Sequence, residues 1–398
     1  MSELISVETA VALLRTHRLP IISERVPIEN ALGRRLTSPI VAHIARPPVA
    51  MSAMDGYAVR LDDVRTPGAR LKLIGEAPAG RPFNGKVRIG TAVRIFTGSV
   101  IPDGTDHIII QENTQRDGDD VISLQACNDP RHIRAAGLDF ALDDILVETG
   151  TILSPADLAV AAASNNAVVQ AERRLRVGML ANGNELRRPG SDLLPGEIVN
   201  SNPYGLAGLI ERWGGEAINL GIAADTIESI QAHIEAAEAD ILLPIGGASV
   251  GDHDHMHAAF SNAGFESVFQ KVAVRPGKPT WFSKSDRVLA LGLPGNPASA
   301  IVCATLFLAP LLGNDWRTDL VTARLLKDVG ANGPREHFMR GRIQINDDGE
   351  LEIDPAPNQD SSLLRTFLSC NALIRRLPHD TAQIAGQRVR ALPIAPIV

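Results

Sequence analysis

The stretch "LGLPGNPASA", residues 291–300, joins an apolar run ending at Leu291 to a second apolar run that begins at Ile301. Asn296 is able to cap a helix, and Pro297 suits the first position of one, so the pattern predicts a strand followed directly by a helix. Ligands bind at the carboxyl ends of parallel strands, and a helix start favours anions. Taken alone, the joint fits either an anion site or a well-made turn.

The residues around this joint alternate between strand and helix patterns from about residue 174 onward. "LRVGML", "EAINLGI" and "DILLPIGG" read as strands, and "NPYGLAGLIERWG" and "DTIESIQAHIEAAEA" read as helices. We expect Asn202 to cap the first helix and Asp225, with Glu228, to form a capping box on the second. Such alternation predicts a doubly wound α/β domain with a mostly parallel sheet and helices on both faces.

The composition describes a soluble multi-domain protein. A chain of 398 residues exceeds one hydrophobic core, so about two to four domains are expected. The net charge is −7 and no run of Lys or Arg occurs, which argues against a nucleic-acid partner. Three widely spaced cysteines indicate a reducing compartment. No signal peptide is evident and residues 300–313 are too short to span a bilayer, so a cytoplasmic protein without membrane contact is expected.

Two stretches in the α/β region carry groups suited to a phosphate and a metal. In "IGGASVGDHDH" (245–255), Ser249 offers a hydroxyl, and Asp252 and Asp254 offer the hard oxygen ligands that Mg²⁺ takes beside phosphates. In "VRPGKPTWF" (274–282), Arg275 and Lys278 flank a stiff turn and suit an anion. The residues thus predict a phosphate-bearing ligand bound with Mg²⁺. The histidines at 253, 255 and 257 suggest zinc less well, because no second ligand cluster accompanies them.

Five motifs together resemble the MoeA / gephyrin E-domain family of molybdopterin molybdenumtransferases. They are "SAMDGYAVR", "FTGSVIPDGTDHIIIQEN", "GGASVGDHD", "RPGKP" and "GLPGNPASA", in this order and at the family's spacing. The resemblance covers nearly the whole chain. It implies a helical/extended linker domain (1–45 and 140–172), an inserted β-rich domain (46–139), an α/β molybdopterin-binding domain (173–327) and a C-terminal, barrel-like β domain (328–398).

The resemblance also implies a reaction and an assembly. Molybdate replaces AMP on adenylylated molybdopterin with the help of Mg²⁺. The resemblance further implies a homodimer, in which the α/β domain of one subunit and the β domain of the other form each site.

Site residues are carried over position by position from the matching motifs. The resemblance implies catalytic roles for Asp55, Thr97, Asp139, Glu185 and Asp225. It implies substrate binding by Ser249, Lys271, Arg275, Lys278, Pro294, Asn296, Pro297 and Ser299, and a metal contact at Asp254 beside Asp252. Arg340 and Ser361 or Ser362 resemble residues that reach toward molybdate.

Several positions depart from the family pattern. Asn184 and Asn200 stand where aspartates are usual, Arg275 replaces a lysine, and Pro244-Ile245 replace a hydroxyl-rich pair. Two alternatives to the molybdenumtransferase therefore remain. One is a molybdopterin adenylyltransferase, for which a single α/β domain suffices. The other is a non-catalytic dimeric scaffold or binding protein, which the two amide substitutions favour.

Overall fold

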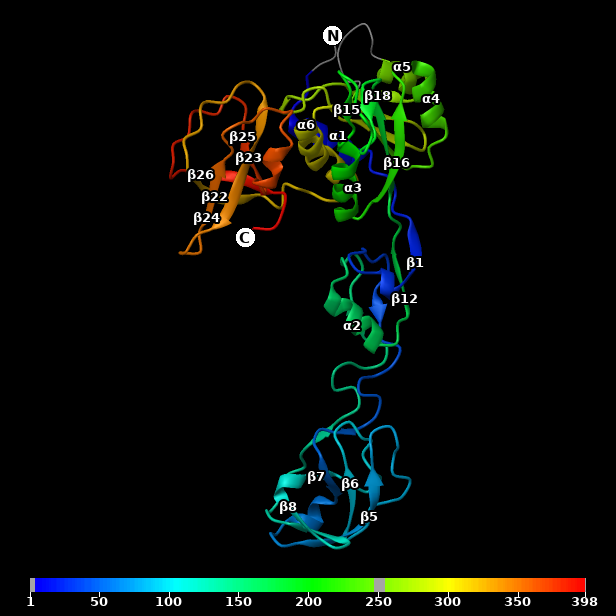
Figure 1. Cartoon of the computed structure of the whole chain (residues 1–398). Coiled ribbons are helices and arrows are strands. Elements are labelled where there is room, and N and C mark those ends of the chain that lie inside the picture. The colour runs from blue at the N-terminus through cyan, green and yellow to red at the C-terminus, as the bar shows by residue number, and fades with distance from the viewer. Residues whose placement is uncertain (1–3, 247–254, 398) are drawn as a thin grey trace. The chain divides into compact units, whose positions relative to one another are not determined.

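The computed structural model describes residues 4–246 and 255–397. The chain divides into two compact units, one formed by Ile22–Arg173 and the other by Met1–Ile21 with Arg174–Val398. The second unit holds the α/β domain and a C-terminal barrel, and both are labelled in Figure 1.

A six-stranded sheet forms the centre of the α/β domain, in the order β16-β13-β17-β21-β20-β18. The first four of these strands are parallel to one another, and β20 runs antiparallel to both of its neighbours, β21 and β18. Their bounds are β16 Glu216–Ala223, β13 Arg176–Asn182, β17 Ile241–Ile245, β21 Leu289–Gly292, β20 Trp281–Lys284 and β18 Glu266–Phe269. The predicted, mostly parallel sheet is confirmed.

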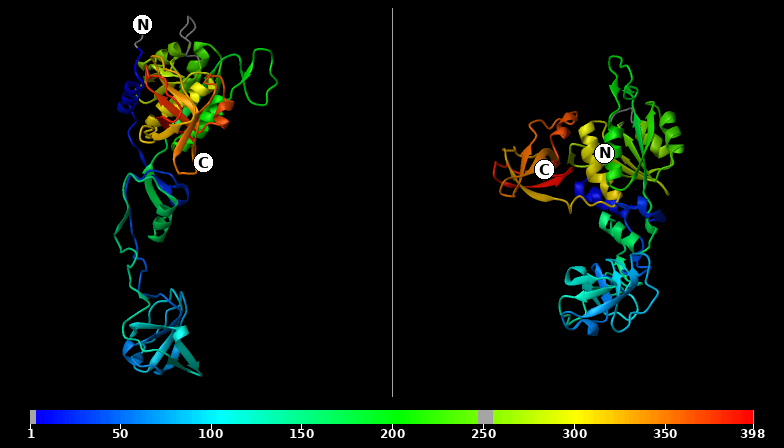
Figure 2. Two further views of the ribbon diagram at one scale, coloured as in Figure 1. Left: turned by 90° about the vertical axis from the view of Figure 1, so that its left-hand side faces the viewer. Right: turned by 60° about the horizontal axis from the view of Figure 1, so that its bottom comes forward.

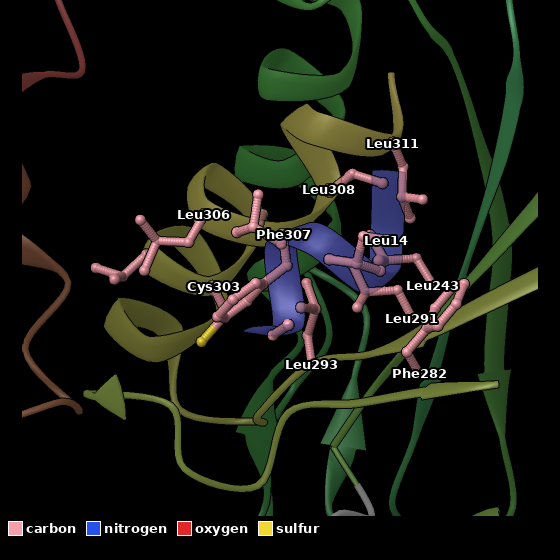
Figure 3. Packing of buried hydrophobic residues seen from close by; sticks show 14 of the residues in the cluster. Leu14, Leu243, Phe282, Leu291, Leu293, Cys303, Leu306, Phe307, Leu308 and Leu311 are labelled. Atoms are coloured by element: carbon pink, nitrogen blue, oxygen red, sulfur yellow. The ribbon is translucent and has the colours of Figure 1, made fainter. Parts of the chain in front are cut away.

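Helices cover both faces of this sheet, as expected for a doubly wound domain. One face packs against α1 (Val7–Thr16), α3 (Asn202–Arg212) and a continuous segment made of α6 (Pro297–Cys303), the π-helical turn η4 (Ala304–Leu308) and α7 (Ala309–Leu311). The other face packs against α4 (Ile227–Glu235) and α5 (His255–Asn262). Figure 3 shows side chains of this first core, among them Leu14 of α1, Phe307 of the helical segment and Leu291 of β21.

The first helix lies in a different unit from the one that the sequence suggested. In α1, Val7, Ala10, Val11 and Leu14 are buried at helical spacing, and the Ser6 hydroxyl caps the helix by accepting from the Thr9 amide. These side chains join the α/β core, so α1, which the sequence grouped with the 1–45 linker domain, packs against the sheet of the α/β domain.

The C-terminal domain is a closed barrel of five strands. The order is β23-β24-β22-β26-β25, and β25 pairs again with β23. Their bounds are β22 Val321–Leu325, β23 Glu336–Ile345, β24 Leu351–Pro355, β25 Ala372–Arg376 and β26 Arg388–Pro393. The domain begins with β22, before the expected boundary at residue 328. A short strand of the α/β domain, β19 (Val274–Arg275), pairs in parallel with β23 and connects the barrel to the Arg275 turn.

The other unit, Ile22–Arg173, contains a small linker part and a β-rich part. In the linker part, β1 (Ser23–Pro27) pairs with β12 (Val168–Glu172) and β2 (Ile40–Val41) pairs with β11 (Ile145–Val147). The helix α2 (Pro155–Ala163) starts with the capping box of Ser154 and Asp157. The β-rich part is a sheet in the order β7-β4-β6-β5-β9-β8 and a short pair, β3 with β10. Their bounds are β3 Met51–Ser52, β4 Gly56–Val59, β5 Arg70–Ala77, β6 Thr91–Ile95, β7 His107–Ile110, β8 Thr114–Asp117, β9 Asp120–Ser123 and β10 Ile133–Arg134.

Two helix caps differ from the sequence-based expectation by one residue. The cap of α3 is Ser201, and the Asn202 side chain instead donates to the carbonyl of Gly295 at 2.7 Å. The cap of α4 is Thr226, which accepts from the Ser229 amide, so Asp225 lies just outside the helix. The side chains of Asn202 and Asp225 are therefore not used as helix caps and are available at the edge of the sheet. Among the described residues, no helix combines the length and the apolar character needed to cross a membrane.

The turn between Arg275 and Lys278 is held against α6 by close packing. Gly277 has φ +115°, and a Cβ on this residue would collide with the sulfur of Cys303, which is labelled in Figure 3. Burial raises the pKa of the Cys303 thiol to about 12, so the sulfur is an uncharged packing group. The glycine and the cysteine therefore fix the distance between the turn and the helix.

We predict that Gly277→Ala lowers the free energy of unfolding by about 2–4 kcal/mol, because it adds both a steric collision and backbone strain. The double variant Gly277→Ala/Cys303→Ala should recover only the part of the lost free energy of unfolding that is due to the collision. Chemical denaturation of the purified variants measures this. Gly330→Ala is the control, because a Cβ there meets nothing within 4 Å. Equal stability of Gly277→Ala and the control would show that the turn is not held in this way.

Candidate functional site

A cavity of about 780 Å³ opens at the carboxyl edge of the parallel strands. Strand β13 contributes Asn182 to it, β17 contributes Ile245, and the joint after β21 contributes Pro294–Pro297. The lining also includes Glu185, Leu186, Ile198, Val199, Asn200, Ser201, Asn202, Gly246, Pro279 and Ser362. This is the edge at which open α/β sheets bind ligands.

The joint "LGLPGNPASA" is met by a loop of the barrel. Asn296 donates from Nδ2 to the Ser361 hydroxyl at 2.9 Å, and the Ala298 amide donates to the Ser361 carbonyl at 3.1 Å. One of the free N–H groups at the start of α6 is therefore occupied by a hydrogen bond within the protein. Of the residues predicted to bind substrate, Pro294, Asn296 and Pro297 line the cavity, whereas Ser299 is only 4 % exposed and is not part of the lining.

Arg340 holds this barrel loop in place. The side chain is 1 % exposed and donates to the carbonyls of Leu363 and Asp360, both at 2.9 Å. Gln359 bonds to the amide and the carbonyl of Arg340, also at 2.9 Å. The guanidinium that was expected to reach toward molybdate thus binds backbone carbonyls, and the loop brings Ser362 to the cavity.

At the end of β13, two asparagines hold Asp225. The Asn182 amide donates from Nδ2 to Asp225 Oδ1 at 3.0 Å, and Asn184 Oδ1 accepts from the Asp225 amide at 3.2 Å. Glu185 lines the cavity, and its carboxylate folds back over Gly183, where a Cβ would lie 2.5 Å from Oε2. Glu185 and Asp225, both predicted, therefore lie at the same edge. Asn182 is not among the residues predicted from the sequence, although its position as a polar residue at the end of a buried strand was an available signal.

None of the predicted cations Lys271, Arg275 and Lys278 belongs to the cavity lining. Lys278 is exposed and precedes Pro279, which lines the cavity. The carbonyl of Lys278 accepts a hydrogen bond from the amide of Val272, the residue after Lys271. Arg275 is exposed on β19 and pairs in register with His337. The pKa of His337 is lowered to about 3, mainly by burial and secondly by the charge of the neighbouring Arg275. His337 therefore adds no charge at neutral pH.

In the other unit, Asp55 and Thr97 form a closely bonded pair. Asp55 Oδ1 accepts from the Thr97 amide at 2.7 Å and from its hydroxyl at 2.9 Å. These bonds, the backbone bond first, lower the pKa of Asp55 from its ordinary value, with a smaller contribution from Arg94. The Arg94 guanidinium lies 5.0 Å from the ring centroids of both Tyr57 and Phe96, which fixes its orientation.

Asp139 lies apart from this pair. Its carboxylate is 3.4 Å from Arg46 Nε, with both side chains more than half exposed, so the pair contributes little to stability. Both residues line a second cavity of about 470 Å³, with apolar neighbours such as Ile44 and Leu138.

The remaining predicted residues, Ser249, Asp252 and Asp254, lie outside the described residues, as does His253. On either side of them, Gly246 lines the cavity and α5 begins at His255. The ring of His257 packs against Trp281, with centroids 4.7 Å apart. Within the described ranges, no group of three His, Cys, Asp or Glu residues could hold a metal ion.

Three family descriptions match the chain in succession. Residues 5–165 match the MoeA N-terminal region (domain I and II), residues 178–314 match a probable molybdopterin binding domain, and residues 322–394 match the MoeA C-terminal region (domain IV). The matched ranges agree with the barrel starting at β22.

Relatives and solved structures of similar length agree with these matches. The chain is 34% identical over 368 residues to a molybdopterin molybdenumtransferase of Haemophilus influenzae, covering 89% of this chain and 90% of the relative. A relative of the same name from Bacillus subtilis is 31% identical over 388 residues, covering 94% and 90%. The molybdopterin biosynthesis MoeA protein of Pyrococcus horikoshii superposes with a TM-score of 0.84 at 28% identity, covering 99% of this chain and all of that one. The chain belongs to the MoeA family.

Proposed function

We propose that this protein is a molybdopterin molybdenumtransferase, which inserts molybdate into adenylylated molybdopterin and releases AMP. The observation that carries the proposal is the cavity at the sheet edge, built jointly by the "PGNP" joint, the end of β13 and the barrel loop. Relatives that bear this name match most of the chain. The presence of both β-rich parts disfavours a simple adenylyltransferase.

The residues divide into anion-binding and acidic groups. Lys271, Arg275 and Lys278 would bind the phosphates and the oxyanion by charge. Ser249 would add a hydroxyl, and Ser362 offers another from the barrel loop. Glu185 and Asp225 supply the carboxylates for proton transfer at the edge, and Asp55, Thr97 and Asp139 belong to the proposed catalytic set.

Mg²⁺ is part of the proposal, with Asp254 and Asp252 as its protein ligands. These two aspartates follow Gly246, a cavity residue, within a few positions of the chain. Mg²⁺ usually takes one or two carboxylates together with substrate phosphates, so a pair of aspartates fits it without a preformed cluster. When bound, the ion would neutralise phosphate charge as AMP leaves.

The proposed reaction has a direct test. Purified protein is mixed with adenylylated molybdopterin, Mg²⁺ and either molybdate or no oxyanion, and AMP is measured over time. We expect AMP release that depends on molybdate. Tight binding of molybdopterin without any AMP release would contradict the proposal and favour the scaffold alternative, and consumption of ATP with molybdopterin would favour the adenylyltransferase.

Asp254→Ala should abolish Mg²⁺-dependent turnover and leave the fold intact, because it removes an anionic ligand beside the phosphates. The measurement is the rate of AMP release over a Mg²⁺ titration, with circular dichroism as the check on folding. Asp286→Ala, in the turn before β21, is a matched control. Wild-type activity at limiting Mg²⁺ would remove Asp254 from the role.

We further propose a homodimer in which residues of two subunits complete each site. Asp55→Ala and Lys278→Ala should each be inactive, and mixing them should restore activity, because some mixed dimers contain one intact site. Subunit exchange is verified with two affinity tags before the assay. No recovery after verified exchange would place the site within one subunit.

A further inference from the structure

The side-chain amide of Asn182 makes a hydrogen bond through its NH₂ group, whereas its oxygen has no partner among the described residues. Asn182 is the last residue of β13, lines the main cavity and is 6 % exposed. Its Nδ2 donates to Asp225 Oδ1 at 3.0 Å. Its Oδ1 is buried and has no hydrogen-bond partner among the residues that the structure describes.

The orientation of this amide follows from the chemistry of its neighbour. A carboxylate only accepts hydrogen bonds, so the NH₂ of Asn182 must face Asp225 and the oxygen must face the other way. On that side lies Gly246, a second cavity residue, and a Cβ on Gly246 would come within 3.7 Å of the oxygen. Gly246 has φ +93° and carries no side chain that could cover the oxygen.

A buried hydrogen-bond acceptor that lacks a donor is unfavourable, and such groups are rare in folded proteins. They persist where a ligand supplies the missing donor. We infer that Asn182 positions the carboxylate of Asp225 and presents its own neutral oxygen to a hydrogen-bond donor of the bound pterin substrate. This inference rests on the proposed function and deepens it.

The neutrality of the oxygen matters as much as its position. Glu185 is the charged side chain in the described part of the lining, and Asp225 contacts Asn182 directly. A third carboxylate here would lie about 3 Å from Asp225, where two like charges repel strongly. An amide supplies an acceptor to the ligand and a donor to Asp225 without adding charge.

Three variants test the inference: Asn182→Leu, Asn182→Asp and the swap Asn182→Asp/Asp225→Asn. Each is titrated with molybdopterin by calorimetry, with and without Mg²⁺, and its melting temperature is measured. Asn182→Leu should bind at least about tenfold more weakly than the wild type. A loss that is equal in both titrations supports a donor of the pterin itself. A loss seen only with Mg²⁺ would contradict the inference, because the donor would then be a metal-bound water.

Asn182→Asp should bind weakly at high pH and recover as the pH falls, because the paired carboxyl groups then share a proton and restore the donor. The swap re-forms the hydrogen bond with its direction reversed, so the melting temperature should recover. Binding should stay weak in the swap, because the cavity then faces a charged oxygen.

Two further results would overturn the inference. In the first, Asn182→Leu binds molybdopterin as the wild type does. In the second, the swap restores binding together with the melting temperature, which would show that Asn182 has only a structural role. Failure of the wild type to bind molybdopterin is a different result, because it would contradict the proposed function as well.

Discussion

The contact between Ser361 of the barrel loop and the start of α6 is the constraint on which the candidate site depends. Through it, Asn296 and the Ala298 amide are both satisfied by a residue of another domain. A parallel sheet with a glycine-proline joint provides an edge, but that edge alone is open to solvent. The barrel loop adds Ser362 to the lining of the cavity, and Arg340 holds the loop by its carbonyls.

On the acidic side of the cavity, neutral amide side chains orient a charged group. Asn182 and Asn184 both bond to Asp225, one to its side chain and the other to its backbone. The family pattern has an aspartate where Asn184 stands, and the amide oxygen of Asn184 also accepts the Asp225 N–H. The substitution that favoured a scaffold protein is thus compatible with an intact site. The cations, in contrast, are held by a turn whose geometry depends on Gly277 packing against Cys303.

Strand and helix periodicity was sufficient to predict the α/β domain, because the buried runs of β13, β17 and β21 are nearly all apolar. The local pattern around Asn296 and Pro297 pointed to the sheet edge, whereas Glu185 and Pro294 came from the family resemblance, and all four residues line the cavity. The sequence could not show that Ser299 is buried or that Arg340 binds a loop, because both depend on contacts between segments far apart in the chain. It also could not show that α1 packs on the α/β core, since an amphipathic helix does not reveal which core it covers. The loop between β14 (Leu186–Arg187) and β15 (Ile198–Val199), which Figure 2 shows projecting from the α/β domain, likewise had no periodic signal.

The central claim is that the barrel loop, held by Arg340, completes the ligand edge of the sheet. Hydrogen–deuterium exchange of Arg340→Met, compared with the exposed neighbour Arg365→Met, tests it most directly. The account predicts that Arg340→Met speeds exchange at residues 358–364 and at the Ala298 amide and weakens molybdopterin binding, while Arg365→Met does neither. Unchanged exchange at Ala298 and in the loop, with binding lost, would contradict the account and assign Arg340 a direct contact with the ligand.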